Sequence, residues 1–578
     1  MVNVKNLFGM AVMATALVGC SSSDDITPNA NEGNQTGAAY ASFKINLPTT
    51  SGTRATDDGK PTFAEGTADE YEVKNGTILI FDSDGKFVES ADLGTMNPWT
   101  KDTDPNGVTT AAAATVQLHN VKVGTSYKAL VLLNNNVDAT TKKVKLPSVG
   151  DSYYTWSAVV GNANATKYES TTDGIFMANA PKYENDTENP TTLVDFNSVY
   201  ASREQAQANP ATVVYVERGL AKVTMDDFAS NYPIDAGTYK GDNVKIENWE
   251  LDVTNKFTFP IHQADLKSEW SAVWSEPRFY DTKESSAFKR VYWGTDPNYS
   301  GTDNLTLTNC QAAFKMIGNG DVKGLAGIAN PQYCLENTFD LDNMKQGQTT
   351  RVVFKAVYSP KTFAPNETFY KVANNTAVWH VNDLKTQIKT LALQAMGITT
   401  TAEQGKYDVK LDATTNNISG EAGQHIIKTA NITFSDETGT YSSKIDDEVV
   451  KTVNEKLGLS EDPTTHKVIV GISTYLNGVA YYIARIKHFN TLTPWEAGQH
   501  TYKDAPSLTT EQSNKKYLGR YGVLRNNWYA LSVTKISNLG YPEVPEVKPT
   551  VPDDENDQYI NVEVKILDWA KRTQEIEL

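Results

Sequence analysis

Apolar residues recur at every second position in many short runs of this chain, and that alternation is typical of β-strands that bury one face. The last such run, QYINVEVKILDW, contains Ile560, Val562, Val564 and Ile566 at alternate positions. The stretch before it, PEVPEVKPTVPDDENDQ, is rich in Pro and acidic residues and cannot continue a sheet. The final strand is therefore attached through a linker. It either folds back onto its own domain or pairs with another molecule.

A similar run lies near the N-terminus, and its pattern predicts a second half-buried strand. The apolar positions of this run are Ala41, Phe43, Ile45 and Leu47. A small, polar stretch, TTSGTRATDDGK, follows and is typical of an exposed loop that proteases cut. An Arg-specific protease would cut there between Arg54 and Ala55 and free the strand. From the residues alone, an ordinary solvated loop Arg is the more common explanation.

The first twenty residues predict a secretory signal peptide. One Lys precedes an apolar stretch that is too short to span a bilayer permanently. The stretch ends in LVGC, which resembles the bacterial lipobox, and that resemblance implies lipidation, such as palmitate, and signal cleavage at Cys20. The alternative is a plain signal peptide with an incidental Cys. Residues 21–54 would then form a tether and the removable N-terminal strand.

The bulk composition excludes one class of function and leaves the state of two cysteines open. The chain has 578 residues with a net charge of −17, and it lacks the basic stripe that a nucleic-acid-binding protein needs. Strand-like runs outnumber helical ones, so we expect a mainly β protein. Beyond Cys20, the chain has only Cys310 and Cys334, which lack metal-ligand spacing. They either form a disulfide or are two separately buried thiols.

Four features of the sequence could indicate a function, and a simpler explanation competes with each. DSDG at residues 82–85 is too short for a calcium loop and predicts a β-turn. The seven His residues show no zinc-binding spacing, and no pair of carboxylates stands out for glycosidase chemistry. The aromatic run at residues 270–299 could stack on sugars or grip a host protein, or else fill a core. We therefore expect no catalytic site, metal or cofactor.

Several sequence blocks together resemble the fimbrillins of Bacteroidales, specifically the Mfa type of fimbrium subunit. In chain order they are GTILIFDSDGKFVES, SYKALVLLNN, GIFMANA, VYVERGLAKVTM, GVAYYIARIKHF, GVLRNNWYALSVTKISNLG and the closing YINVEVKILDW. The blocks are scattered over nearly the whole chain, and their order together with the lipobox carries the resemblance.

The resemblance implies a mainly β fold of two transthyretin-like β-sandwich domains, with short helical insertions in the second. We place the domains at residues 55–212 and 213–548, and a linker with a C-terminal donor strand at 549–578. The resemblance also implies lipidation at Cys20, maturation by an Arg-specific protease after Arg54, and polymerisation by strand exchange through the tail. We expect Trp569 to anchor the end of that donor strand.

These implications describe a shaft-type structural subunit that supports adhesion. It would be exported as an outer-membrane lipoprotein precursor and end in a cell-surface fimbrium. Its partners would be identical subunits, anchor and tip subunits, the protease and an unidentified surface ligand. One alternative is a monomeric outer-membrane lipoprotein that binds glycans through residues 270–299. A tip subunit and a glycosidase are further alternatives.

The local patterns also predict individual elements. Residues 78–81 and 86–89 should form a hairpin, and the apolar run at 127–133 suits a strand buried on both faces. Helical spacing occurs at 383–393 and 446–457, and residues 182–210 should form a loop or a short helix. Residues 213–225 and 244–253 are expected to be neighbouring strands of one sheet in the second domain.

Overall fold

The protein is described here by a computed structural model. The described residues are 38–48, 67–94, 108–138, 140–159, 167–168, 172–182, 190–264, 291–299, 306–405, 407, 409–411, 424–427, 432–434, 445–488, 492–495, 510–553 and 560–568. Three of the predicted sites, Cys20, the Arg54–Ala55 bond and Trp569, lie outside these residues.

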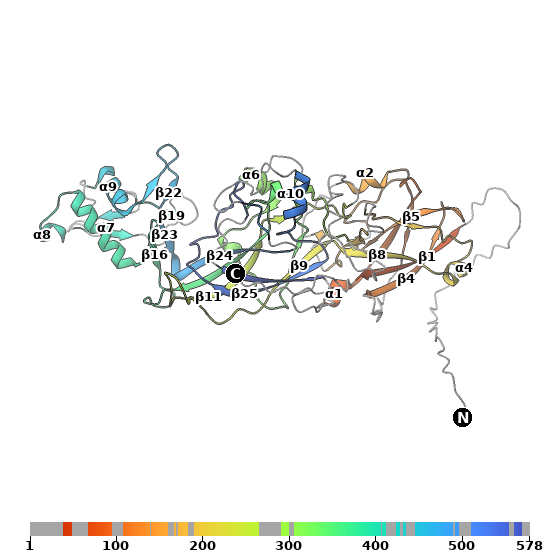
Figure 1. Cartoon of the computed structure of the whole chain (residues 1–578), viewed down its shortest axis with the longest axis horizontal. Coiled ribbons are helices and arrows are strands. Elements are labelled where there is room, and N and C mark those ends of the chain that lie inside the picture. Colours follow the sequence, from red (N-terminus) through yellow and green to blue (C-terminus); the bar gives the residue numbers. More distant parts are fainter. Residues whose placement is uncertain are drawn as a thin grey trace, which may run out of the picture. The chain divides into compact units, whose positions relative to one another are not determined.

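Eight strands form the first sheet, in the order β3-β2-β5-β6-β8-β1-β4, with β7 paired to β5. Strands β1, β4, β5 and β8 of this sheet are labelled in Figure 1. Their bounds are β1 Ala39–Pro48, β2 Gly76–Phe81, β3 Phe87–Asp92, β4 Val108–Leu118, β5 Tyr127–Leu133, β6 Met177–Asn179, β7 Val194–Phe196 and β8 Thr212–Arg218. The short helices beside these strands are α1 Ala68–Tyr71, α2 Tyr153–Ser157 and α4 Arg203–Ala208.

The two ends of this strand order come together around one apolar core. Glu89 on β3 accepts hydrogen bonds from the backbone N–H groups of His119 and Asn120, just after β4, at 2.7–3.0 Å. Side chains from β1, β2, β4, β5 and β8 meet in the core between them. The predicted hairpin is confirmed, because the Asp82 carboxylate accepts the N–H groups of Asp84 and Lys86 and closes a tight turn. The prediction for residues 127–133 is also confirmed, since β5 is buried on both faces.

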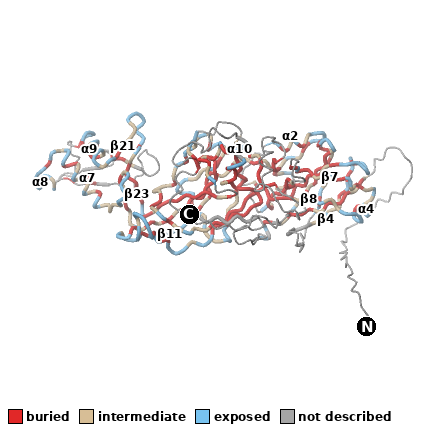
Figure 2. Tube along the Cα trace, in the orientation of Figure 1, coloured by how far each residue is buried: buried red, intermediate tan, exposed pale blue. Residues whose placement is uncertain are grey.

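Two four-stranded sheets follow, with the orders β10-β11-β15-β24 and β14-β9-β25-β26. The strands of the former are β10 Tyr232–Pro233, β11 Asn243–Asp252, β15 Arg351–Ser359 and β24 Val479–Arg485. Those of the latter are β9 Leu220–Met225, β14 Gln332–Leu335, β25 Asn527–Ile536 and β26 Ile560–Asp568. Both sheets contribute to one core that includes Trp249, Phe354, Tyr482 and Tyr529. Buried residues run along the strands, and exposed residues lie mainly in loops (Figure 2).

One sequence prediction about these strands is wrong. Residues 213–225 and 244–253 are not neighbouring strands of one sheet, because β8 joins the first sheet whereas β9 pairs with β14 and β25. The chain changes sheets at Gly219, between these two short strands. The first sheet thus includes β1, which lies before the 55–212 range expected for the first domain, and β8, which runs past the end of that range. The domain boundaries themselves stay a prediction.

A further sheet, β17-β16-β23-β19, carries the longer helices of the chain. Its strands are β16 Phe369–Val372, β17 Val378–His380, β19 Gln424–His425 and β23 Ile472–Tyr475. The helices α7 Val381–Ala395 and α9 Asp447–Leu457 confirm the two helical predictions. Asp446 caps α9 by accepting the N–H of Val449, and Gly458 ends the helix with a φ of 73°.

The remaining elements are short. The paired strands are β12 Thr254–Asn255 with β13 Phe314–Lys315, β18 Val409–Leu411 with β20 Ile432–Phe434, and β21 Ser460–Glu461 with β22 Val468–Val470. The helices are α6 Leu307–Ala313, α8 Thr401–Gln404 and α10 Thr510–Tyr517, and the 3₁₀ turns are Pro297–Tyr299, Asn319–Asp321, Leu341–Asn343 and Leu476–Gly478. Strands dominate, so the mainly β prediction is confirmed, while the transthyretin-like sandwich topology stays a prediction.

Candidate assembly site

The N-terminal strand β1 lies inside the first sheet, between two strands that are distant in sequence. It pairs antiparallel with β4, from Ala39 opposite Leu118 to Pro48 opposite Val108. It pairs parallel with β8, where Phe43 lies opposite Thr212. Because β1 has a hydrogen-bonded neighbour on each side, it is a central strand of this sheet rather than an edge strand.

One face of β1 contributes directly to the core of the first sheet. The predicted positions Ala41, Phe43, Ile45 and Leu47 are all at most 2% exposed. The Phe43 and Phe196 rings pack edge to face with their centroids 5.1 Å apart. Fully burying a Phe, Ile or Leu side chain contributes about 1.5–3 kcal/mol. The alternating pattern thus identified the core-facing residues of this strand.

The other face of β1 is also largely covered, whereas the sequence predicted a half-buried strand. The Ser42 hydroxyl donates to the Ala206 carbonyl of α4 at 2.8 Å and lies 2.9 Å from the Thr115 hydroxyl of β4. The Arg203 guanidinium of α4 stands over the Tyr40 ring at 5.5 Å. The short helix α4 therefore covers the outer face of β1, which a local alternation pattern cannot reveal.

The C-terminal strand β26 pairs antiparallel with β25 of its own chain. The register sets Val564 opposite Leu531 and Ile566 opposite Tyr529. Of the two possibilities left open for this strand, folding back onto its own domain is the one found in the structure of the single chain. β26 stands at the end of its sheet's strand order, next to β25.

Buried charged residues surround the point where β8 leads into β9. The Lys222 ammonium lies 2.6 Å from the Glu70 carboxylate, and the Tyr333 hydroxyl donates to the same carboxylate at 2.7 Å. Burial alone would raise the pKa of Glu70, but hydrogen bonds from Lys222 and Tyr333, together with the Lys222 charge, hold it below its usual 4.5. This ion pair joins the α1 segment to strand β9.

Two of the sequence blocks that resemble fimbrillins meet at this point. Strand β9 carries Lys222 opposite Trp528 of β25, and the Lys222 ammonium lies 3.8 Å from the centre of the Trp528 ring. The Arg218 guanidinium donates to the Asn526 side chain at 3.2 Å and to the Glu70 carbonyl at 2.8 Å. The charged positions of VYVERGLAKVTM are therefore buried structural residues.

Two further buried pairs of ionisable side chains include Glu217, which precedes Arg218, and Arg525, which precedes Asn526. His262 Nδ1 is 2.7 Å from the Glu217 carboxylate, and the Arg525 guanidinium is 3.2 Å from Glu336. Arg525 also donates to the carbonyls of Phe259 and Pro260. Among the described residues, no group of three or more His, Cys, Asp or Glu side chains is arranged to hold a metal ion. We interpret these contacts as structural.

Two open questions from the sequence concern the cysteines and the aromatic run. Cys310 on α6 and Cys334 on β14 are both buried, and the structure has them as thiols, while the disulfide between them stays a prediction. In the described part of the aromatic run, Tyr292 and Trp293 are at most 3% exposed, and the Tyr299 hydroxyl donates to the Asn337 side chain. These three residues fill cores. The rest of the run, residues 270–290, lies outside the described residues.

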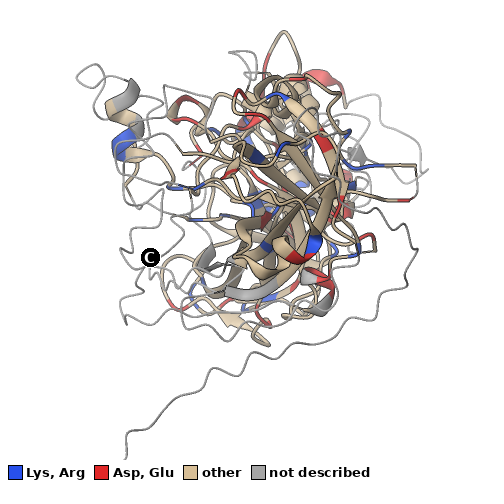
Figure 3. Cartoon of the chain, turned by 90° about the vertical axis from the view of Figure 1, so that its right-hand side faces the viewer, with Lys and Arg blue, Asp and Glu red and all other residues tan. Residues whose placement is uncertain are grey.

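Two general features of the described residues are the distribution of their charges and the character of their helices. Segments with Lys or Arg and segments with Asp or Glu are interspersed over the described ribbon (Figure 3). In the part of the chain that the structure describes, no helix has the length and apolar character needed to cross a membrane.

The described residues form a mainly β protein, with β1 near one end of the chain and β26 near the other. A family model matches one segment of the chain: residues 473–575 match the C-terminal region of Fimbrillin, the major fimbrial subunit protein type IV. The matched segment contains β24, β25 and β26. Over this segment the chain is similar to a family of fimbrial subunits.

The other comparisons add little. The chain resembles the crystal structure, at 2.38 Å resolution, of a fimbrial assembly protein from Parabacteroides distasonis ATCC 8503. The two are 12% identical, with 56% of this chain and 86% of that chain covered, and the TM-score is 0.27. At that score the likeness carries no argument about fold or function. No curated protein matches the chain.

Proposed function

We propose that the chain is a shaft-type fimbrial subunit that polymerises by donor-strand exchange after proteolysis at Arg54. The supporting observation is the position of β1, a central core strand that precedes the predicted cleavage loop. Once the chain is cut after Arg54, β1 is held only by non-covalent contacts. The lipid at Cys20 would keep the precursor at the outer membrane until that cut, and would then remain with the released segment.

Loss of β1 has two physical consequences for the first sheet. The facing edges of β4 and β8 lose their hydrogen-bond partners, and such unpaired edges readily bind another strand. The core also loses the side chains of Phe43, Ile45 and Leu47, which leaves an apolar groove. The walls of this groove are β4 and β8. Strand β8 stays paired with β6, and the hydrogen bonds that Glu89 of β3 accepts from the backbone after β4 keep β4 in place.

The tail strand has the sequence that such a groove requires. Ile560, Val562, Val564 and Ile566 repeat the period of Ala41, Phe43, Ile45 and Leu47. In the single chain β26 pairs with β25 at the end of a sheet, whereas in the groove it would pair with two strands. Transfer into the groove of another subunit therefore gains backbone pairing as well as apolar burial.

This contact is head to tail, because the groove and the donor strand belong to different parts of the chain. A head-to-tail contact that does not close into a ring makes an open filament. Anchor and tip subunits would terminate the filament, and the filament would carry the adhesive function of the cell surface.

The first test uses the purified precursor, residues 21–578, treated with an Arg-specific protease. Assembly is followed on unboiled gels and the cut is mapped by mass spectrometry. The matched control ends at Asp557 and so lacks the tail strand. We expect cleavage after Arg54 and a ladder of oligomers from the longer protein only.

Site-specific cross-linking tests the contact itself. In the precursor, Ala114 of β4 lies opposite Phe43, so an Ala114→Cys subunit marks the groove. We expect it to form disulfide-linked dimers, after cleavage, with a subunit that carries Cys at Val562 or Val564. A precursor that is cut after Arg54 yet stays monomeric, with no such cross-link, would refute the shaft function.

A further inference from the structure

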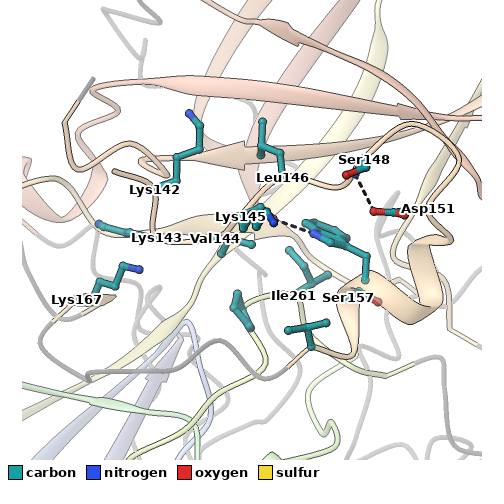
Figure 4. Close-up of a pocket in the computed structure, with 13 residues that line it drawn as sticks. Lys142, Lys143, Val144, Lys145, Leu146, Ser148, Asp151, Ser157, Lys167 and Ile261 are labelled. Carbon is teal, nitrogen blue, oxygen red and sulfur yellow. Dashed lines mark hydrogen bonds between the residues drawn. The ribbon is translucent and has the colours of Figure 1, made fainter. Parts of the chain in front are cut away.

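A cavity of about 390 Å³ opens in the N-terminal part of the protein, away from β1 in sequence (Figure 4). One wall is the segment after β5, with Lys142 to Leu146. The second is α2 with Trp156 and Ser157, and the third is Pro260 with Ile261. Its volume is in the range of small-ligand sites.

The walls are tied to one another by hydrogen bonds. The Gln263 side-chain amide donates to the Ser157 carbonyl at 3.0 Å, which joins the third wall to α2. The Trp156 indole N–H donates to the Lys145 carbonyl at 2.8 Å, which joins α2 to the first wall. The Arg525 guanidinium donates to the Pro260 carbonyl at 3.2 Å. The cavity is therefore held in shape before any ligand enters.

The lining is cationic in a chain whose net charge is −17. Lys142, Lys143, Lys145 and Lys167 all line the cavity (Figure 4). The acidic residue of the lining is Asp151, and its carboxylate accepts the backbone N–H of Ser148 at 2.8 Å. Positive charge thus exceeds negative charge around this cavity, opposite to the balance of the whole chain.

Lys143 adds a buried ammonium group to this excess. The residue is 3% exposed, and its Nζ donates to the Gly174 carbonyl at 2.6 Å. Burial lowers the pKa of Lys143 to about 8, Asp173 raises it, and the charges of Lys167 and Lys74 lower it again. A ligand anion would relieve the repulsion among these lysines.

The remaining lining is apolar and aromatic. Val144, Leu146 and Ile261 stand beside the Trp156 indole, whose orientation is fixed by its hydrogen bond. Val159, also in the lining, is 62% exposed and so adds apolar surface that solvent reaches. A simple inorganic anion would leave these surfaces unused, whereas a sugar ring has apolar C–H faces that pack against an aromatic ring.

We propose that this cavity binds an acidic saccharide unit, a sugar ring that bears one carboxylate or sulfate group. The lysines pair with the anion, and Trp156 with its apolar neighbours packs against the ring. This site is separate from the β1 groove and does not depend on strand exchange. Through this site the subunit would hold acidic polysaccharide at the cell surface. The glycan-binding residues would then be those of the cavity and not those of the aromatic run at 270–299.

Binding is tested on the soluble precursor by saturation-transfer NMR titrations. The probes are glucuronic acid, glucose 6-sulfate, glucose and inorganic sulfate, so that carboxylate, sulfate, ring and anion are compared separately. The pocket variant is Lys145→Glu with Lys167→Glu. The matched control, Lys240→Glu with Lys245→Glu, makes the same charge change at two exposed lysines of the second part of the chain. A third variant, Trp156→Leu, removes the aromatic face, and its fold is checked by circular dichroism.

We expect at least one acidic sugar to bind about tenfold more tightly than glucose and inorganic sulfate. The pocket variant should lose about tenfold in affinity for that sugar, whereas the control should change less than twofold. Trp156→Leu should weaken the acidic sugar while leaving inorganic sulfate unchanged. The proposal is overturned if neither acidic sugar binds, if glucose or inorganic sulfate binds as tightly, or if the pocket and control variants behave alike.

Discussion

Phe43 of β1 and Phe196 of β7 pack edge to face, with ring centroids 5.1 Å apart and planes at 75°. Phe196 in turn lies against the Tyr127 ring of β5, with centroids 6.0 Å apart. Through this aromatic series, the N-terminal strand is fixed in the core by side chains as well as by its backbone pairing. Under the proposed strand exchange, the same contacts would have to break before β1 leaves, so they would set how long a cut precursor remains unassembled.

Phe43→Ala should lower the free energy of unfolding of the uncut precursor by about 3–5 kcal/mol, because it leaves a cavity in the core. It should also make the cut protein polymerise faster, since β1 is held less tightly. Urea unfolding and the rate of ladder formation measure the two effects. Lys44→Ala, on the other face of β1, is the control and should change both less. Slower assembly of the cut Phe43→Ala protein would contradict this account.

Ile560→Asp together with Val564→Asp should block polymerisation, because two carboxylates would enter an apolar groove. The single chain should still fold, because β26 stands at the end of its sheet's strand order and pairs with β25 alone. Asn561→Asp with Lys565→Asn, at the alternate positions, is the control and should still assemble. Electron microscopy of the cut proteins shows the difference, and full-length fibres from the Ile560 and Val564 double variant would rule out the tail as donor.

Arg54→Ala should trap a lipidated precursor at the outer membrane, because the predicted cleavage bond is lost. Mass spectrometry of the membrane fraction should find β1 still part of the chain, and no fibres should form. Arg54→Lys, treated with a Lys-specific protease, should restore assembly. Normal maturation of Arg54→Ala in cells would place the cut elsewhere.

Lys222→Met should destabilise the protein by about 3–5 kcal/mol, because it leaves the Glu70 carboxylate buried without its ion-pair partner. Adding Glu70→Gln should recover part of that loss. The pKa of Glu70 is lowered in the folded protein, so its contribution is present above pH 4.5 and is lost as the pH falls below that value. Wild type should therefore lose its advantage over Glu70→Gln in urea unfolding on going from pH 6 to pH 3.5. A constant difference would show that Glu70 titrates alike in both states.

Lys143 should make the protein more stable, relative to Lys143→Met, as the pH rises from 8 to 10.5. The folded protein releases this proton near pH 8, whereas the unfolded chain holds it to about 10.5. The unfolded state thus binds more protons in this window, and stability rises with pH. Urea midpoints of both proteins at pH 7.5 and 10 measure the change. Parallel curves would show that burial does not perturb this ammonium group.

The alternation of apolar residues was enough to predict β1 and its four core positions, because strand faces follow from a local period. Its place in the sheet was not predictable in this way. Ala39 lies opposite Leu118 and Phe43 opposite Thr212, and no local pattern encodes pairing over such separations. For the same reason, the sequence could not decide whether β26 pairs with its own chain.

No prediction from the sequence covered several charged residues whose surroundings only the fold reveals. Lys142, Lys143 and Lys145 look like an ordinary solvated loop, and only the approach of α2 and Ile261 makes them the lining of a cavity. Their concentration in an acidic chain was a signal that could have drawn attention to them. Glu217 and Lys222, which an alternating pattern would place in solvent, are about 2% exposed because other segments cover them.

The direct passage of β8 into β9 at Gly219 has a mechanical consequence for a fibre built by strand exchange. A donor strand held beside β8 would pull on β8, and through Gly219 on β9, which pairs in parallel with β25. From β25 the chain continues to the tail, which in the proposed fibre would enter the next subunit. Tension along the fibre would therefore act in shear on rows of backbone hydrogen bonds within each subunit, so that many bonds resist it together. The Glu70–Lys222 ion pair would add resistance at β9, between β8 and β25.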